Sequence, residues 1–121
     1  MKKILFLMKE KNLLEKYLFL MKNYEYETTG FLLHDKKLME KIDKLENVNI
    51  VIIEVDECGI EIKKVVKKLK EKFKDCKFLI LIPEINDKIQ NFIIDFSIDS
   101  YLVFPVLPFQ LLRSIFLLNN L

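Results

Sequence analysis

The sequence predicts a single α/β domain built around a parallel β-sheet. Residues 50–53 form a short, β-branched apolar run without alternation, which is typical of a strand covered on both faces. Similar runs occur at residues 4–7, 78–82 and 101–104, and segments with apolar residues at helical spacing separate them. A chain of 121 residues has room for one such domain, so we expect residues 1–121 to fold as one unit.

The first part of the chain is expected to form strand, helix and strand. After the strand at residues 4–7, apolar residues at helical spacing between Leu13 and Met21 predict a helix. Residues 24–29 then alternate aromatic or threonine residues with glutamate, as an exposed edge strand would. Gly30 is expected to permit a turn after this strand.

A second helix should lead into the most apolar strand. His34 or Asp35 can cap this helix, which is expected to end near Asn47. The strand at residues 50–53 follows and runs directly into Glu54. His34 has no Cys or second His nearby in the sequence, so we expect it to be a cap or a surface residue and not a metal ligand.

The third helix, which follows Gly59, should be amphipathic and basic. Its apolar stripe is narrow, and lysines cover the remaining face: Lys63, Lys64, Lys67, Lys68, Lys70, Lys72 and Lys74. Such a face is usually a solvated surface, which we favour over contact with an anion, a membrane or nucleic acid. The net charge of only +2 also argues against general capture of nucleic acid.

The last part of the chain repeats the strand and helix alternation. The strand at residues 78–82 is stopped by Pro83, and residues 85–96 show apolar positions at helical spacing. The strand at residues 101–104 is followed by Pro108, which suits the first position of a final helix.

Five strands alternating with five helices predict a three-layer sandwich, because crossovers between parallel strands are right-handed. A flavodoxin-like strand order, 2-1-3-4-5, places the polar second strand at an edge. The carboxyl ends of the strands would then meet around one shallow basin, formed by residues 8–10, 54–56, 82–83 and 104–105.

The cysteines and the hydropathy of the chain indicate the environment in which it is expected to fold. Cys58 and Cys76 lack the spacing of a metal site and are expected to be free thiols in a reducing, cytoplasmic protein. A helix amino end beside Cys58 could lower the pKa of its thiol, but we favour an ordinary thiol because no histidine base accompanies it. The apolar runs are too short to span a bilayer, so no membrane contact is expected.

The chain resembles the receiver domain of two-component response regulators, the phosphoacceptor module also found in chemotaxis regulators, over almost its whole length. The matching features are the apolar strand at residues 50–53 with an acid at Glu54, the pair Cys58-Gly59 where the family usually has Pro-Gly, and residues 100–105, which end in proline.

The resemblance assigns family positions to residues that differ from the family pattern. It places Glu54 at the phosphoacceptor, Met8 and Lys9 at the acidic pair that holds magnesium, Ile82 at the hydroxyl position, Phe104 at the lysine position and Tyr101 at the aromatic switch position. Only the last assignment matches the family's residue type.

These replacements predict a pocket that does not carry out the family's chemistry. A methionine and a lysine in place of two acids remove the oxygen ligands that magnesium requires, so no metal or cofactor is expected. Lys9 is expected to pair with Glu54 or Asp56. Asp56 remains a possible substitute acceptor, while Glu10 could turn inward in place of the lost acids but is more simply a solvated loop residue.

We therefore expect an atypical receiver-like signalling module, not an enzyme, that acts by protein contact. Glu54 either imitates the phosphorylated state or sits in an inert pocket. The alternative is a phosphorylatable receiver in a phosphorelay that uses Glu54 or Asp56. A flavin- or nucleotide-binding module is less favoured, because no glycine- or hydroxyl-rich phosphate loop follows the first strand.

The carboxyl-terminal region has more apolar residues than one sheet face can cover, and such an excess is typical of interaction sites. These residues are Phe104, Val106, Leu107, Phe109, Leu111, Leu117, Leu118 and Leu121. The resemblance implies a dimer or partner face formed by the fourth helix, fifth strand and fifth helix. We expect Phe104, Val106, Phe109, Leu117 and Leu118 to contribute to it, although a fragment of a longer regulator would expose the same residues.

Overall fold

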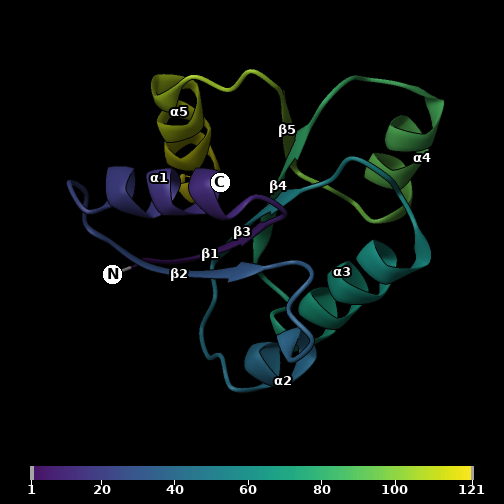
Figure 1. Ribbon diagram of the computed structural model, residues 1–121, viewed down its shortest axis with the longest axis horizontal. Helices are drawn as coiled ribbons and strands as arrows, with labels where there is room; N and C mark the ends of the chain where they lie inside the picture. Colours follow the sequence, from purple (N-terminus) through teal and green to yellow (C-terminus); the bar gives the residue numbers. More distant parts are fainter. Residues whose placement is uncertain (1, 121) are drawn as a thin grey trace.

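The computed structural model describes residues 2–120 and contains five strands and five helices in strict alternation (Figure 1). In chain order the elements are β1 (Lys2–Met8), α1 (Lys11–Met21), β2 (Tyr26–Leu32), α2 (Leu38–Asp43), β3 (Ile50–Glu54), α3 (Ile60–Lys72), β4 (Lys77–Ile82), α4 (Asp87–Asp95), β5 (Ser100–Val103) and α5 (Pro108–Asn119). Among residues 2–120, no helix has the length and apolar composition needed to cross a bilayer.

All neighbouring strands of the sheet are parallel, in the order β2-β1-β3-β4-β5. This confirms the predicted flavodoxin-like order. The strands β1, β3 and β4 lie inside the sheet, where their side chains are buried on both faces, and this burial explains their unbroken apolar sequences.

The core consists of two layers, one on each side of the sheet. Alternate residues of β1 point to opposite faces, so Ile4 and Phe6 pack toward α1 and α5, while Leu5 and Leu7 pack toward α2, α3 and α4. Figure 1 shows these two groups of helices on opposite sides of the sheet. The three-layer architecture therefore follows from burying both faces of the central strands.

Gly30 does not form a turn, which corrects the sequence expectation. It lies inside β2 and pairs with Phe6 of β1. A Cβ atom built at Gly30 would lie 2.6 Å from Leu14 Cδ1 and 3.0 Å from Leu18 Cδ1. The glycine is therefore needed because α1 packs closely on this strand.

The second helix is shorter than the sequence suggests. It ends at Asp43 instead of near Asn47, which adopts a left-handed conformation with φ 59°. Neither His34 nor Asp35 occupies the cap position, which is Lys37. Asp35 instead stabilises the preceding turn, because its Oδ1 accepts a hydrogen bond from the Lys37 main-chain N–H at 2.8 Å.

Candidate functional site

The carboxyl ends of four strands meet at one edge of the sheet. Parallel pairing places Leu7 beside Ile53, Glu54 beside Leu81, and Ile82 beside Val103. The residues that follow these strands therefore gather in one region, as the sequence predicts. In open α/β sheets this edge is the usual location of ligand sites.

Two residues assigned to the pocket point into the core instead. Met8 is fully buried with the α1 and α5 layer, and Ile82 is fully buried with the layer of α2, α3 and α4. Neither residue is among those that line the two pockets beside Glu54. Their assignment to an open pocket is corrected, because burial on both sheet faces continues to the last residue of β1 and β4.

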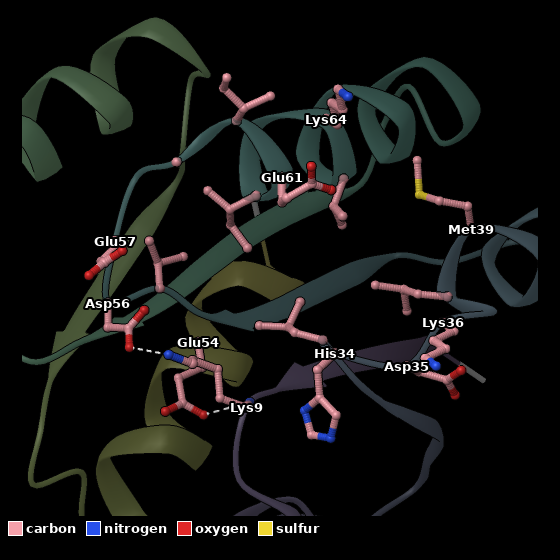
Figure 2. A pocket seen from close by; sticks show the side chains of 17 residues that line it. Lys9, His34, Asp35, Lys36, Met39, Glu54, Asp56, Glu57, Glu61 and Lys64 are labelled. Atoms are coloured by element: carbon pink, nitrogen blue, oxygen red, sulfur yellow. Dashed lines mark hydrogen bonds and ion pairs between the residues drawn. The ribbon is translucent and has the colours of Figure 1, made fainter.

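Lys9 joins the two acids that follow β3. Its main-chain N–H donates a hydrogen bond to Glu54 Oε1 at 2.9 Å. Its ammonium forms an ion pair with Asp56 Oδ2 (Figure 2). The predicted pairing of Lys9 with one of these acids is therefore confirmed, and both acids are engaged by the same residue.

The ion pair is half exposed, and this limits its energetic contribution. The side chains of Lys9 and Asp56 are 49% and 45% exposed, so water screens their attraction. The hydrogen bond from Lys9 nevertheless lowers the pKa of the Asp56 carboxyl, and the same bond raises the pKa of Lys9. Both groups are thus held in their charged forms.

The arrangement does not fit a magnesium ion. Magnesium requires several oxygen ligands in near-octahedral geometry, usually including carboxylates. Here the ammonium of Lys9 forms an ion pair with Asp56, and the main-chain N–H of Lys9 donates a hydrogen bond to one oxygen of Glu54. Fewer carboxylate oxygens are therefore available to a metal. Within residues 2–120, no three His, Cys, Asp or Glu side chains are grouped so that they could hold a metal.

A large pocket opens beside this ion pair. Its volume is about 840 Å³, and it lies between the β2–α2 loop, the β3–α3 loop and the first turns of α3. Figure 2 shows Lys9, Glu54 and Asp56 on one side of it, with Glu61 and Lys64 of α3 opposite. Its lining residues include lysines, carboxylates and apolar side chains, so charges of both signs surround it.

A smaller pocket of about 290 Å³ lies on the other side of Glu54. Its lining residues are Glu10, Leu13, Tyr17, Glu54, Phe104, Pro105 and Val106. Glu10 is exposed, but it contributes to this pocket instead of being only a solvated loop residue. Tyr17 could not be identified from the sequence, because a tyrosine on the apolar stripe of a helix is typical of a core residue.

The two cysteines are poorly suited to reactive chemistry. Burial raises the pKa of the half-buried Cys58 thiol, and it raises the pKa of Cys76 to about 11. The thiolate form that would act as a nucleophile is therefore disfavoured at both positions. This supports the interpretation of Cys58 as an ordinary thiol.

The carboxyl-terminal apolar residues divide between core and surface. Leu111 and Leu118 lie on the buried side of α5, so Leu118 does not contribute to an exposed face, and its assignment there is corrected. Phe104 and Val106 are half-buried and pack against the core, whereas Leu121 lies outside the described residues. The exposed members on β5, α5 and the loop between them are Tyr101, Val103, Leu107, Phe109, Phe116 and Leu117.

The fold of this chain resembles solved structures, although its sequence matches no known family. No protein-family model and no curated protein matches the sequence of this chain. A CheY-like response regulator receiver domain protein from Methanospirillum hungatei superimposes with a TM-score of 0.82 at 19% identity, covering 99% of this chain and 95% of that chain. The chemotaxis response regulator CheY4 of Vibrio cholerae gives a TM-score of 0.80 at 18% identity, covering 98% of both chains.

A third similar structure is not a chemotaxis or receiver protein by name. A putative pilus assembly protein (CpaE) from Burkholderia thailandensis matches with a TM-score of 0.82 at 14% identity, and all of both chains is covered. Identities this low establish the shared architecture and not a shared activity. The strand order, the alternation of elements and these superpositions together show that the chain has the CheY-like fold of response regulator receiver domains.

Proposed function

We propose that this chain is an atypical receiver-like signalling module that acts by protein contact and without magnesium-dependent aspartyl phosphorylation. The observation that carries the proposal is the ion pair between the Lys9 ammonium and Asp56, next to Glu54. An ammonium in this position neutralises an acid that would otherwise help to hold a metal, and it repels a divalent cation.

The residues around Glu54 also supply little of what phosphoryl transfer requires. That reaction depends on accurate positioning and on groups that neutralise the charge of the transferred phosphoryl group. Phe104, which lines the smaller pocket with Glu54, offers neither a cation nor a hydroxyl, and Ile82 is buried in the core. Glu54 is one methylene longer than aspartate, which displaces its carboxylate from the position of an aspartyl nucleophile.

Intact-mass measurement after incubation with acetyl phosphate and magnesium tests this proposal. We expect no added phosphoryl group on this chain, while a chemotaxis receiver treated in parallel gains one. An added phosphoryl group that disappears in Glu54→Gln or Asp56→Asn would contradict the proposal. It would favour the alternative, a phosphorylatable receiver that uses the substituted residue.

Contact with a partner is the second part of the proposal. The surface formed by α4, β5 and α5, here called the α4–β5–α5 face, carries exposed apolar side chains that include Val103, Phe109 and Leu117. Apolar groups gathered on a surface are typical of protein interaction sites. Under this proposal the chain is a binding module and not an enzyme, and its partner is a second copy or another protein.

A further inference from the structure

The smaller pocket has a consistent electrostatic character. It lies between α1 and the loop that joins β5 to α5, with a volume of about 290 Å³. Glu10 and Glu54 contribute carboxylates, and the described residues that line it include no Lys, Arg or His. The ammonium of Lys9 is committed to Asp56 and is not among the lining groups. The described side chains that line it therefore carry a net negative charge.

Tyr17 lines this pocket and carries an unsatisfied polar group. Its side chain is only 5% exposed, and its hydroxyl is buried without a hydrogen-bond partner among residues 2–120. Buried hydroxyls are nearly always hydrogen-bonded, because leaving one unpaired costs about 1–3 kcal/mol. Burial raises the pKa of Tyr17, and the charge of Glu54 raises it further, so the phenol stays protonated.

We propose that this pocket binds the ammonium group of an alkylammonium ion, either a small free amine or a lysine side chain of a partner protein. An ammonium has three N–H donors, and three of the residues that line the pocket, Glu10, Glu54 and Tyr17, carry acceptor oxygens. Hydrogen bonds between an ammonium and carboxylates are charge-assisted and strong. Leu13, Phe104 and Val106 provide an apolar wall for the alkyl stem.

The same groups suit an organic cation better than a metal ion. Two carboxylates and one phenol fall short of the oxygen shell that magnesium or calcium requires. One oxygen of Glu54 also accepts the N–H of Lys9, which fixes its orientation. This site goes beyond the proposed function and does not depend on it, since contact through the α4–β5–α5 face requires no ligand in this pocket.

Titration with n-butylammonium chloride, followed by two-dimensional NMR of the ¹⁵N-labelled chain, tests the site directly. We expect saturable shifts of the main-chain amides of Glu10, Leu13 and Val106. Potassium chloride at the same ionic strength and n-butanol, which has the same stem without the charge, should not reproduce these shifts. Equal shifts with n-butanol, or none beyond those of potassium chloride, would overturn the proposal.

Three variants separate specific binding from general charge attraction. Glu54→Gln should weaken binding about tenfold, because a charge-assisted hydrogen bond is lost. Tyr17→Phe should weaken it roughly threefold, because a neutral acceptor is lost. Glu57→Gln removes a carboxylate that lines only the larger pocket and should leave affinity unchanged. Equal affinity in Glu54→Gln and the parent chain would refute the assignment.

Unfolding in urea excludes loss of structure as the cause of weaker binding. The Tyr17 hydroxyl makes no hydrogen bond with the described protein, so Tyr17→Phe should unfold at the same or a higher urea concentration than the parent chain. Reduced affinity together with unchanged stability would then place the phenol in the binding site. A weakened affinity that tracks a lower unfolding midpoint would count against it.

A second ligand distinguishes the two sources of the ammonium. Nα-acetyl-lysine N-methylamide carries the same group on a peptide backbone. Comparable affinity for both ligands would assign the pocket to a partner's lysine, while binding of n-butylammonium alone would assign it to a small amine. Shifts of the same amides by magnesium chloride, with no response to either amine, would overturn the proposal in favour of a metal site. The phosphorylation experiment remains an independent test of the proposed function.

Discussion

Lys9 contributes to the carboxyl edge of the sheet through both its main chain and its side chain. The main-chain N–H holds Glu54, and the ammonium holds Asp56. Two acids on one strand end would repel each other if left alone, and a cation between them reduces this repulsion. A single residue thus fixes the geometry and the charge of the site.

Replacing Lys9 with methionine should raise the pKa of the Asp56 carboxyl toward its ordinary value, because the hydrogen bond that lowers it is removed. A ¹³C-detected NMR titration of the Asp56 carboxyl measures this change. Lys41→Met is a matched control, since Lys41 pairs with Asp35 in the same way and lowers the pKa of that carboxyl. It should leave the titration of Asp56 unaffected.

The same pair predicts a pH dependence of stability with a definite sign. The folded-state pKa of Asp56 is lowered, so its stabilising contribution is present above the unfolded-state pKa and is lost as pH falls through the folded-state value. The free energy of unfolding of Lys9→Met should lie below that of the parent chain by less than about 1 kcal/mol at neutral pH. A difference that persisted at strongly acidic pH would point to another cause.

At the scale of elements, close packing between α1 and β2 depends on Gly30. The space where a Cβ would lie is occupied by methyl carbons of Leu14 and Leu18. Leu14 is buried, so it cannot turn away into solvent. The glycine therefore sets how closely the first helix approaches the edge strand.

Gly30→Ala should lower the free energy of unfolding by about 1 kcal/mol. Overpacking against Leu14 costs roughly 1–3 kcal/mol, and the reduced entropy of the unfolded chain offsets about 0.4–1 kcal/mol of this. Urea unfolding of a double-mutant cycle with Leu14→Ala supplies the control. In that background Gly30→Ala should be close to neutral, because the nearer methyl, at 2.6 Å, is gone and only the contact with half-buried Leu18 remains. Additive effects of the two changes would refute the proposed contact.

The ease of prediction differs among the elements for physical reasons. The strands β1, β3 and β4 are predictable because burial on both faces leaves unbroken apolar runs. Because both faces of these strands are apolar, the sequence does not indicate to which face the last residue of a strand points. The inward direction of Met8 and Ile82 is therefore not evident from the sequence. The limits of β2 are likewise not evident from the sequence, because the role of Gly30 depends on how closely the preceding helix α1 packs on this strand.

Within the site, prediction succeeds where contacts follow from topology. Lys9 and Asp56 come just after neighbouring parallel strands, so their proximity follows from the strand order. To predict the smaller pocket, one would need to know the path of the loop after β5 and how deeply Tyr17 is buried. Both depend on tertiary packing, which no local sequence pattern indicates. Pairings set by the sheet are therefore predictable, while pockets between layers are not.

At the scale of the whole molecule, the apolar side chains on the surface are unevenly distributed. Phe109 is 64% exposed on α5, and Tyr101 and Val103 are exposed on neighbouring β5. Burying a phenylalanine side chain contributes about 1.5–3 kcal/mol. These are the apolar side chains that an association through the proposed α4–β5–α5 face would bury.

Phe109→Ser should weaken self-association of the chain, measured by sedimentation over a range of concentrations. We expect the parent chain to sediment faster as its concentration rises, and the dissociation constant of the variant to be about thirtyfold or more higher, because about 2 kcal/mol of apolar burial is lost. Phe19→Ser removes an equally exposed phenylalanine from α1, outside this face, and should behave like the parent chain. Both positions are exposed, so neither change should alter stability by more than about 0.5 kcal/mol. Equal weakening by both substitutions would show that self-association is not specific to the α4–β5–α5 face, and a monomeric parent chain at every concentration would exclude the homodimer.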